Sequence, residues 1–447
     1  MKAQRDLTVG NPSYILISFA LPFFIANLLQ ALYMAVDLLV IGNFSSNPAN
    51  CAAVANGAQI MMLVVLFIVG FTTGATVIIG KYFGSKQHLQ MQEFIGSSIC
   101  AFLIFTGALV LLSFLAAPWL IRFLNTPEEA SEQANVYVNI CISGLFFTIG
   151  YNVLSSILRG VGNSIIPMIT VGVACAFNVV GDLVLIGVYN MGPAGAAYAT
   201  IASQAIGMIL TFVYLARHPE IFPFKLSGLR IYKEHIYKLF AIGAPIAIQS
   251  TLIDLSFIII FSIVNAFGVN ASAGYGICCR LNGLILLPAI SMGMALTPII
   301  AQNLGANLHA RAMNFYKLSV VYSTIIGLGL FIWMEFWSET AFMLFTRNEE
   351  IIAAGSQYMK SFCFEILVLG FVFSSNGFLN GSGHTRFSMV TNVVPTFLVR
   401  IPYAWIVSLL PGATLYGIGF ASPLASFVSV FITLAYLYTG RWKLNRI

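Results

Sequence analysis

The feature that most constrains this chain is the recurrence of apolar runs long enough to cross a lipid bilayer. Predominantly apolar stretches follow one another along nearly the whole sequence, and about 20 such residues span a hydrocarbon core of roughly 30 Å as a helix. Of the 447 residues, 59% are hydrophobic and 8% are charged, against about 25% charged in soluble domains. The sequence therefore predicts an all-α polytopic membrane protein.

Polar breaks divide these runs into twelve predicted transmembrane helices. Their approximate spans are 13–42, 50–80, 93–116, 135–158, 164–188, 194–216, 237–266, 272–302, 314–338, 351–378, 387–409 and 414–440. The N-terminus has basic Lys2 and Arg5 but no short apolar segment with a small-residue cleavage site. We therefore expect the first helix to belong to the mature protein rather than to a signal peptide.

The net charge of +6 is interpreted as a topology signal. Basic residues gather in the N-terminal arm, in the segment 217–238 and in the tail 441–446, whereas acidic residues gather in other loops. Because Lys- and Arg-rich loops stay cytoplasmic, both termini are predicted to be cytoplasmic, and the basic excess indicates no nucleic-acid partner. The seven cysteines are scattered without metal-ligand spacing or paired loop positions, so neither a zinc site nor a disulfide framework is indicated.

The two halves of the chain repeat one another. The segment "GKYFGSKQH" at 80–88 aligns with "AQNLGANLH" at 301–309, and "LRGVGN" at 158–163 with "LNGSGH" at 379–384, both at an offset of 221. Pro22 pairs with Pro245 at 223. A six-helix unit enters and leaves the membrane on the same side, so the two lobes are predicted to have parallel topology. We expect lobes at 1–216 and 237–447, joined by a basic cytoplasmic linker at 217–236.

Glycines in this pattern predict local structure. The repeated loops share Gly-x-Gly, at Gly160 and Gly162 and at Gly381 and Gly383, which favours a tight turn between helices more than a ligand site. The segment "GFTTG" at 70–74 has two glycines four residues apart, a spacing that permits close contact between helices.

Two acids inside predicted spans of the first half are candidate functional residues. Asp37, in "ALYMAVDLLVIGNF", is the only charged residue between Ser13 and Phe44, and a charge at the bilayer centre costs roughly 2.5–3.5 kcal/mol on insertion scales. Asp182 follows Asn178 by one helical turn, so the two side chains share a face. An acid and an amide facing a second acid can accept a cation or share a proton; the alternative is a hydrogen-bond network that only holds helices together.

The second half has its own buried charges. Asp254 and Glu365 lie in predicted spans and, with Arg280, form a possible second cation or substrate site; Arg280 could cap a vestibule or pair with Asp254, and Arg400 is the other inner cation. All five histidines fall in predicted loops, which disfavours a histidine proton relay. No nucleophile, paired-histidine zinc motif or phosphate-binding loop is recognisable, so neither an enzyme nor a cofactor is expected.

These residues resemble the multidrug and toxic compound extrusion (MATE) family in its bacterial form, over nearly the whole chain. The proline early in the first helix (Pro22), the polar positions Gln30 and Tyr33, and Asp37 look like the first-helix pattern of the family. Asn178, Asp182 and Thr200, in "GAAYAT", are similar to its bacterial cation site. The repeated loop motifs also resemble those after its helices 2, 4, 8 and 10.

The resemblance implies a secondary active multidrug exporter that antiports amphipathic or cationic organic compounds against H⁺ or Na⁺ by rocking of two lobes. Asp37, Asn178, Asp182 and Thr200 are then the cation-coupling set, with Na⁺, if used, at the first three. Charge neutralisation would let the first helix bend near Pro22, where a backbone donor is missing. We expect no cofactor beyond the coupling ion, contact with membrane lipid, a monomer, and the cytoplasmic (inner) membrane.

Two other interpretations stay open. A lipid-linked precursor flippase of the same superfamily should line its cavity with cations for a diphosphate headgroup, whereas the inner charges here are mainly acidic. A receptor or scaffold would need neither duplicated lobes nor buried acids, and full activity in an Asp37→Asn/Asp182→Asn double variant would favour it.

Overall fold

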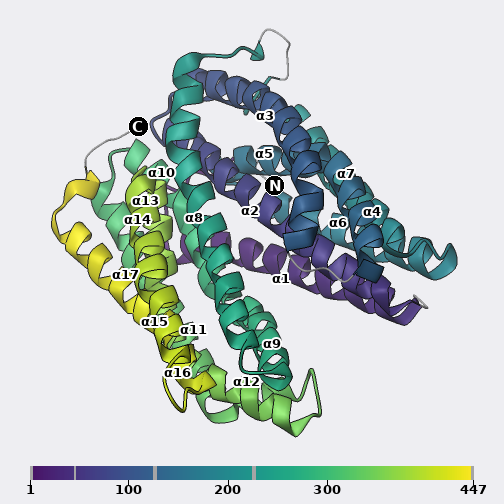
Figure 1. The fold of residues 1–447 in the computed structure, drawn as a ribbon. Coiled ribbons are helices and arrows are strands. Elements are labelled where there is room, and N and C mark those ends of the chain that lie inside the picture. The colour runs from purple at the N-terminus through teal and green to yellow at the C-terminus, as the bar shows by residue number, and fades with distance from the viewer. Residues whose placement is uncertain (1–3, 45–46, 124–127, 224–227, 444–447) are drawn as a thin grey trace. The chain divides into compact units, whose positions relative to one another are not determined.

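The computed structural model describes residues 4–44, 47–123, 128–223 and 228–443, and the described residues fold into helices joined by short connections (Figure 1). The basic residues Lys2 and Arg446 and part of the predicted linker, 224–227, lie outside the described residues. The chain divides into two compact units. We call Met1–Leu7 with Ile25–Ala247 the N-lobe, and Thr8–Phe24 with Ile248–Ile447 the C-lobe.

Two long helices are shared between the units: α1 (Pro12–Phe44) and α8 (Lys233–Asn265). The other elements of the N-lobe are α2 (Pro48–Gly84), α3 (His88–Phe123), α4 (Glu128–Ser143), α5 (Leu145–Gly160), α6 (Ile165–Asp182), the π-helix η1 (Leu183–Val188) and α7 (Gly192–Ala216). Those of the C-lobe are α9 (Val269–Ile285), α10 (Leu287–Gly305), α11 (His309–Phe342), α12 (Glu349–Phe362), α13 (Phe364–Gly381), α14 (Thr385–Pro395), the π-helix η3 (Thr396–Arg400), α15 (Ile401–Ser408), α16 (Leu415–Gly419), α17 (Ala421–Tyr438) and the 3₁₀ turn η4 (Arg441–Lys443).

The predicted fold class is confirmed, but several predicted spans are broken helices. Among the described residues, eleven helices are long and apolar enough to cross a membrane, or twelve if α4 and α5, bent by 47°, form one span. The predicted spans 272–302 and 351–378 are each two helices, which meet at Leu286 and Cys363. Hydropathy stays high through such breaks, so an apolar run does not reveal them.

The predicted internal repeat is confirmed in the backbone. Lys86 and Asn307, 221 residues apart, both adopt left-handed backbone with φ of 60° and 59°, which is uncommon for residues other than glycine. Gly162 and Gly383 stand in the same relation, with φ of 84° and 83°. Each turn ends its helix in the same way, so the predicted tight turns are present in both lobes.

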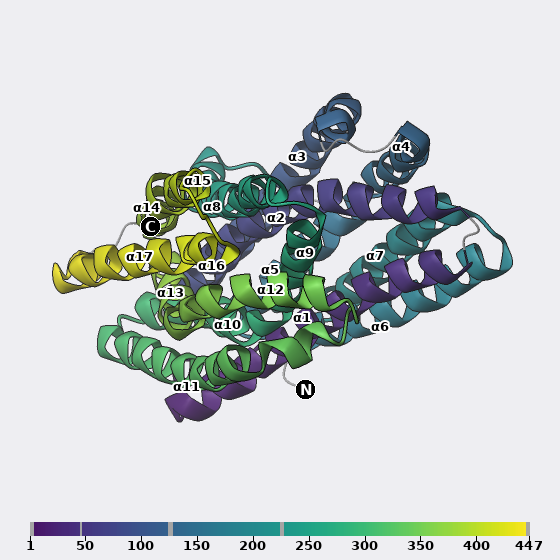
Figure 2. The same ribbon diagram turned by 60° about the horizontal axis from the view of Figure 1, so that its bottom comes forward.

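Glycines also set the close packing inside the N-lobe. A Cβ on Gly70 of α2 would lie 2.5 Å from Cα of Ala247, and one on Gly74 would lie 2.6 Å from Cα of Gly243, both on α8. The "GFTTG" segment is therefore a site of close helix contact, as predicted. Elsewhere in the N-lobe, α6 and α7 lie side by side along most of their lengths (Figure 2).

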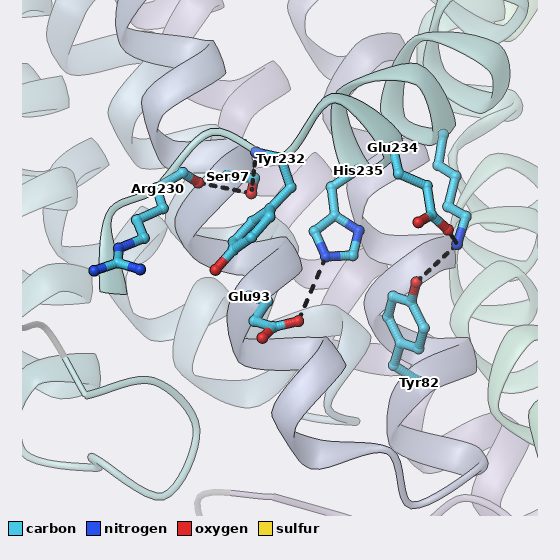
Figure 3. Close-up of polar contacts among 8 residues, drawn as sticks. Tyr82, Glu93, Ser97, Arg230, Tyr232, Glu234 and His235 are labelled. Atoms are coloured by element: carbon cyan, nitrogen blue, oxygen red, sulfur yellow. Dashed lines mark hydrogen bonds and ion pairs between the residues drawn. The ribbon is translucent and has the colours of Figure 1, made fainter. Parts of the chain in front are cut away.

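The connection that leads into α8 is held on the N-lobe (Figure 3). The Ser97 hydroxyl of α3 donates to the backbone oxygen of Arg230 at 2.8 Å and accepts the backbone N–H of Tyr232 at 3.3 Å. In the first turn of α8, His235 lies 3.9 Å from the Glu93 carboxylate. His235 was expected in a loop, but it is helical and 7% exposed.

The compact units do not follow the division expected from sequence. The described part of the predicted linker, 217–223 and 228–236, belongs to the N-lobe, which continues to Ala247, whereas Thr8–Phe24 belongs to the C-lobe. Both boundaries inside helices fall two residues after a proline, Pro22 in α1 and Pro245 in α8. A basic, polar stretch indicates a loop, but it does not reveal which unit that loop packs against.

Candidate functional site

Two buried acids meet inside the N-lobe. Asp37 on α1 is 7% exposed, and Asp182, the last residue of α6, is fully buried. Their carboxyl groups lie within hydrogen-bonding range of each other. Among the described residues, however, no donor reaches Oδ1 of Asp37 or either carboxylate oxygen of Asp182.

This arrangement is incomplete when both acids are ionised. An ionised carboxylate is an acceptor only, so neither acid can then donate to the other, and two like charges lie side by side away from water. A proton on one acid creates an O–H donor for the pair, and a bound cation supplies the missing charge. The geometry therefore suits a site that holds one proton or one small cation.

Two further polar side chains extend this pair. Asn178, one turn before Asp182 on α6, is fully buried, and among the described residues neither its oxygen nor its nitrogen has a hydrogen-bond partner. The hydroxyl oxygen Oγ1 of Thr200 on α7 is also buried and has no hydrogen-bond partner among the described residues. A Cβ on Gly181 would lie 3.0 Å from Cβ of Ala199, so the α7 turn that carries Thr200 packs on the α6 turn that carries Asp182.

A local change of helix type follows the acid pair. The π-helix η1 begins directly after Asp182, and a wider turn of this kind occurs mostly as a short insertion that is frequent at functional sites. The π-helix ends at Val188, and α7 begins at Gly192, whose φ is 55°. The π-helix was not predicted, because Leu183–Val188 is apolar and gives no signal that separates it from an α-helix.

A pocket with a mixed polar and apolar lining lies beside this site within the N-lobe. The pocket is small in this structure: its cavity volume is about 20 Å³, which is room for little more than one water molecule. The lining residues are Gln30, Tyr33, Tyr151, Val171, Ala174, Cys175, Asn178, Ser203, Gln204 and Gly207. Two residues of the first-helix pattern, Gln30 and Tyr33, therefore line one pocket with Asn178.

Pro22, another residue of the first-helix pattern, is not among the residues that line the pocket. It is buried inside α1, which continues through it without a break, and it cannot donate the backbone hydrogen bond that an α-helix forms four residues back. Its segment of α1 belongs to the C-lobe, whereas Asp37 belongs to the N-lobe.

The predicted second site is not assembled by direct contacts. Glu365, expected inside a helix, is the second residue of α13 and accepts a hydrogen bond from the Ser426 hydroxyl at 2.7 Å. Asp254 is half-buried and Arg280 is exposed. In the described part of the chain, no ion pair joins Asp254, Glu365 or Arg280 to a partner.

Of the two predicted inner cations, Arg400 is buried and Arg280 is exposed. Arg400 ends the π-helix η3 and is 4% exposed. Its guanidinium donates to the hydroxyls of Ser256, at 3.1 Å, and Ser422, and its carbon Cζ lies 3.9 Å from the centroid of the Phe257 ring. Sequence reasoning recognised Arg400 as an inner cation but assigned it no site.

As for metals, the described residues hold no group of three or more His, Cys, Asp or Glu side chains that could bind a metal ion. A sodium ion at the acid pair would instead use carboxylate, amide and hydroxyl oxygens, which hard cations prefer. Asp37, Asn178, Asp182 and Thr200 supply oxygens of those three kinds.

A family model described as MatE matches the chain twice, at residues 22–184 and 245–406. Among curated proteins, the probable multidrug resistance protein YpnP of Bacillus subtilis (strain 168) is 29% identical and aligns over 99% of this chain and 98% of its own. The probable multidrug resistance protein NorM of Thermotoga maritima is 27% identical over 88% of this chain and 84% of its own.

Solved structures share the fold. An outward-facing multidrug resistance MATE family transporter of the MOP superfamily matches with a TM-score of 0.92 and 19% identity, over 99% of this chain and 100% of that one. A MOP superfamily transporter from Pyrococcus furiosus, described as having a binding pocket of reverse polarity that suggests a different function, matches with a TM-score of 0.91 and 19% identity, over 99% and 100%.

Proposed function

The chain belongs to the MatE family, and on that premise we propose that it is a secondary active exporter of amphipathic, often cationic, organic compounds. Curated relatives of near-identical length are named as multidrug resistance proteins, which supports this substrate class. The observation that carries the proposal is the buried pair of Asp37 and Asp182, short of a proton or cation, beside a small pocket that Asn178 helps to line.

The acid pair couples export to H⁺ or Na⁺. In the outward-open state the pair takes up the ion, which removes its net repulsion and releases the substrate outside. The lobes then rock inward and the ion leaves. The bared carboxylates next favour a cationic substrate in the pocket. Pro22 lets α1 bend as the protein changes between the outward-open and inward-open states, because a missing backbone donor lowers the energy needed to bend the helix.

The available energy is sufficient for this cycle. Each pH unit supplies about 1.4 kcal/mol, and each charge that moves through 100 mV supplies about 2.3 kcal/mol. One proton per cycle would therefore sustain a substrate gradient of at least about tenfold. The site is a transport site rather than a catalytic one.

Charge disfavours the flippase alternative. A diphosphate headgroup would need cations around it, but the pocket beside the acid pair is lined by neutral side chains as far as the described residues go. Outside the lining, the charges of Asp37 and Asp182 act on Tyr33, and one cation, Arg159, acts on Tyr151. We further propose that the protein acts as a monomer in the cytoplasmic membrane. Its termini are then both inside, because Lys and Arg residues gather in the N-terminal arm, in the segment 217–238 and in the tail.

The test is efflux of a fluorescent lipophilic cation from energised cells, with the proton gradient or the sodium gradient collapsed separately. The intact protein and Glu349→Gln, an acid on the exposed start of α12, should export until one of the gradients is removed. Asp37→Asn and Asp182→Asn should not export at any gradient. Export by the double variant at the intact rate would refute the coupling role and favour a structural network.

A further inference from the structure

The C-lobe buries two opposite charges that the proposed cycle does not use. Arg400, at the end of η3, is 4% exposed, and Glu365, at the start of α13, is 8% exposed. In the described part of the chain, no ion pair joins the two side chains. An unbalanced charge inside a membrane protein is costly, so each of these side chains requires a group of opposite charge nearby.

Two serines one turn apart on α17 connect the charges. The Arg400 guanidinium donates to the Ser422 hydroxyl, and the Ser426 hydroxyl donates to a Glu365 carboxylate oxygen at 2.7 Å. Residues four apart lie on one face of a helix, with their Cβ atoms about 5–6 Å apart. The two charges therefore lie against neighbouring turns of α17, separated by hydroxyls and by a distance on the order of 6–10 Å.

The cation that acts on Glu365 belongs to the protein itself. Among the described residues, the titratable groups that interact with Glu365 are Arg400 and the Tyr358 hydroxyl of α12. Asp254 provides the contrast within the same lobe, because it is half-buried and no described cation acts on it. Of these two acids, only Glu365 has a cation within range.

Neutral groups hold Arg400 in place. Its guanidinium donates to the Ser256 hydroxyl of α8 at 3.1 Å, and Cζ lies 3.9 Å from the centroid of the Phe257 ring. An aromatic face attracts a cation, and a guanidinium keeps its proton throughout the physiological pH range. Arg400 therefore supplies a permanent positive charge at a defined position.

The internal repeat places this cation where the N-lobe has its candidate ion site. At the offset of 221, Arg400 corresponds to Val179, which follows Asn178 directly and lies within one turn of Asp182. In the N-lobe this helix supplies an amide and an acid without described hydrogen-bond partners. In the C-lobe the corresponding helix supplies a cation instead.

We propose that Arg400 is the resident counter-ion of Glu365, so that the C-lobe acid takes up neither a proton nor Na⁺ and the coupling ion binds only at the acid pair of the N-lobe. Ser422 and Ser426 bridge the two charges and keep them from forming a direct pair. The statement about coupling rests on the proposed function, whereas the ionised state of Glu365 does not.

The ionised state of Glu365 is tested chemically, without transport. N,N′-dicyclohexylcarbodiimide partitions into membranes and reacts with a carboxyl group that carries its proton, but only slowly with a carboxylate. Modification of Glu365 in purified protein in lipid vesicles is followed by peptide mass spectrometry between about pH 5 and pH 8. Arg400→Gln removes the positive charge, Arg400→Lys keeps it, and Asp254 is the reference within each chain.

In Arg400→Gln at pH 7, Glu365 should react at least about tenfold faster than in the intact chain, because a unit charge 6–10 Å away changes a protonation equilibrium by roughly that factor or more at an effective dielectric constant of 20. Arg400→Lys should react like the intact chain. A packing role alone would give equal rates in the two variants, since both lose the planar guanidinium. Asp254 should react equally in all three proteins.

Equal rates for Glu365 in Arg400→Gln and Arg400→Lys, or no gain in Arg400→Gln, would overturn the proposal. If Arg400→Gln does not fold, the intact chain decides. Asp254 should then be modified at pH 7, and Glu365 should reach the same rate only at lower pH. Equal rates for the two acids at pH 7, or no modification of Glu365 even at pH 5, would overturn the proposal.

The proposal and the proposed function fail separately. Asp37→Asn should lose export but leave the modification of Glu365 unchanged, because the two acids lie in different lobes. The expected modification pattern in an intact chain that does not export would count against the exporter function alone. Fast modification of Glu365 at pH 7 in a chain that exports would count against the counter-ion alone.

Discussion

Replacing Asp182 by Asn should stabilise the N-lobe, because the amide supplies the donor that the acid pair lacks. Asp37 and Asp182 are within hydrogen-bonding range, and no other described donor reaches the unsatisfied oxygens. If both acids are ionised about 4 Å apart, they repel by about 4 kcal/mol at an effective dielectric constant of 20. In Asp182→Asn that repulsion disappears, and the amide N–H donates to the Asp37 carboxylate.

The magnitude of this gain is bounded by the structure. In the intact protein a proton or cation relieves the repulsion, so the variant gains less than the full 4 kcal/mol, and we expect about 1–3 kcal/mol, the range of a hydrogen bond to a charged group. The gain should be larger at pH 8 without sodium than at pH 6, because a shared proton is harder to keep at the higher pH.

The assay is thermal unfolding of the purified protein, followed by tryptophan fluorescence at pH 6 and pH 8 with and without sodium. Asp182→Leu is the matched control, because it has nearly the shape of Asn but no donor, and it should be about 1.5–3 kcal/mol less stable than Asp182→Asn. If Asp182→Asn is no more stable than either the intact protein or Asp182→Leu at pH 8, the reasoning is refuted.

Three further variants test the packing and the bend. Ser97→Ala removes both hydrogen bonds that hold the connection before α8 and should lower the free energy of unfolding by about 1–3 kcal/mol. Ser98→Ala is the control and should cost less, because the buried Ser98 hydroxyl has no described partner. Equal losses in the two variants would contradict this assignment. Gly74→Ala puts a Cβ 2.6 Å from backbone on α8 and should cost about 1–3 kcal/mol, against little for Gly107→Ala, which meets nothing within 4 Å. Pro22→Ala should slow efflux while leaving ion binding at the acid pair intact, and unchanged turnover would exclude the bend.

The fold class and the repeat could be predicted because both depend on patterns that are visible in the linear sequence. Apolar length identifies a span, and the motifs at 80–88 and 301–309 repeat a turn whose left-handed residue, Lys86 or Asn307, falls at the same place. The meeting of Asp37 and Asp182 was indicated by the cost of burying an isolated acid in lipid, since each requires a partner.

Other features could not be predicted, for physical reasons. The breaks at Leu286 and Cys363 lie inside continuous apolar sequence, where hydropathy does not distinguish a bent helix from a straight one. Glu365 was therefore predicted inside a helix, although it is the second residue of α13. Arg400 packs on the ring of Phe257, 143 positions earlier in the sequence, and only the folded chain brings such residues together.

The most direct test of the central claim is ion movement through purified protein in proteoliposomes that enclose a pH-sensitive or a sodium-sensitive dye. Addition of a lipophilic cation on one side should drive H⁺ or Na⁺ across the membrane in the intact protein, and no such movement should occur with Asp37→Asn. Equal ion movement in the intact protein and Asp37→Asn, or cation transport without any ion movement, would contradict the account.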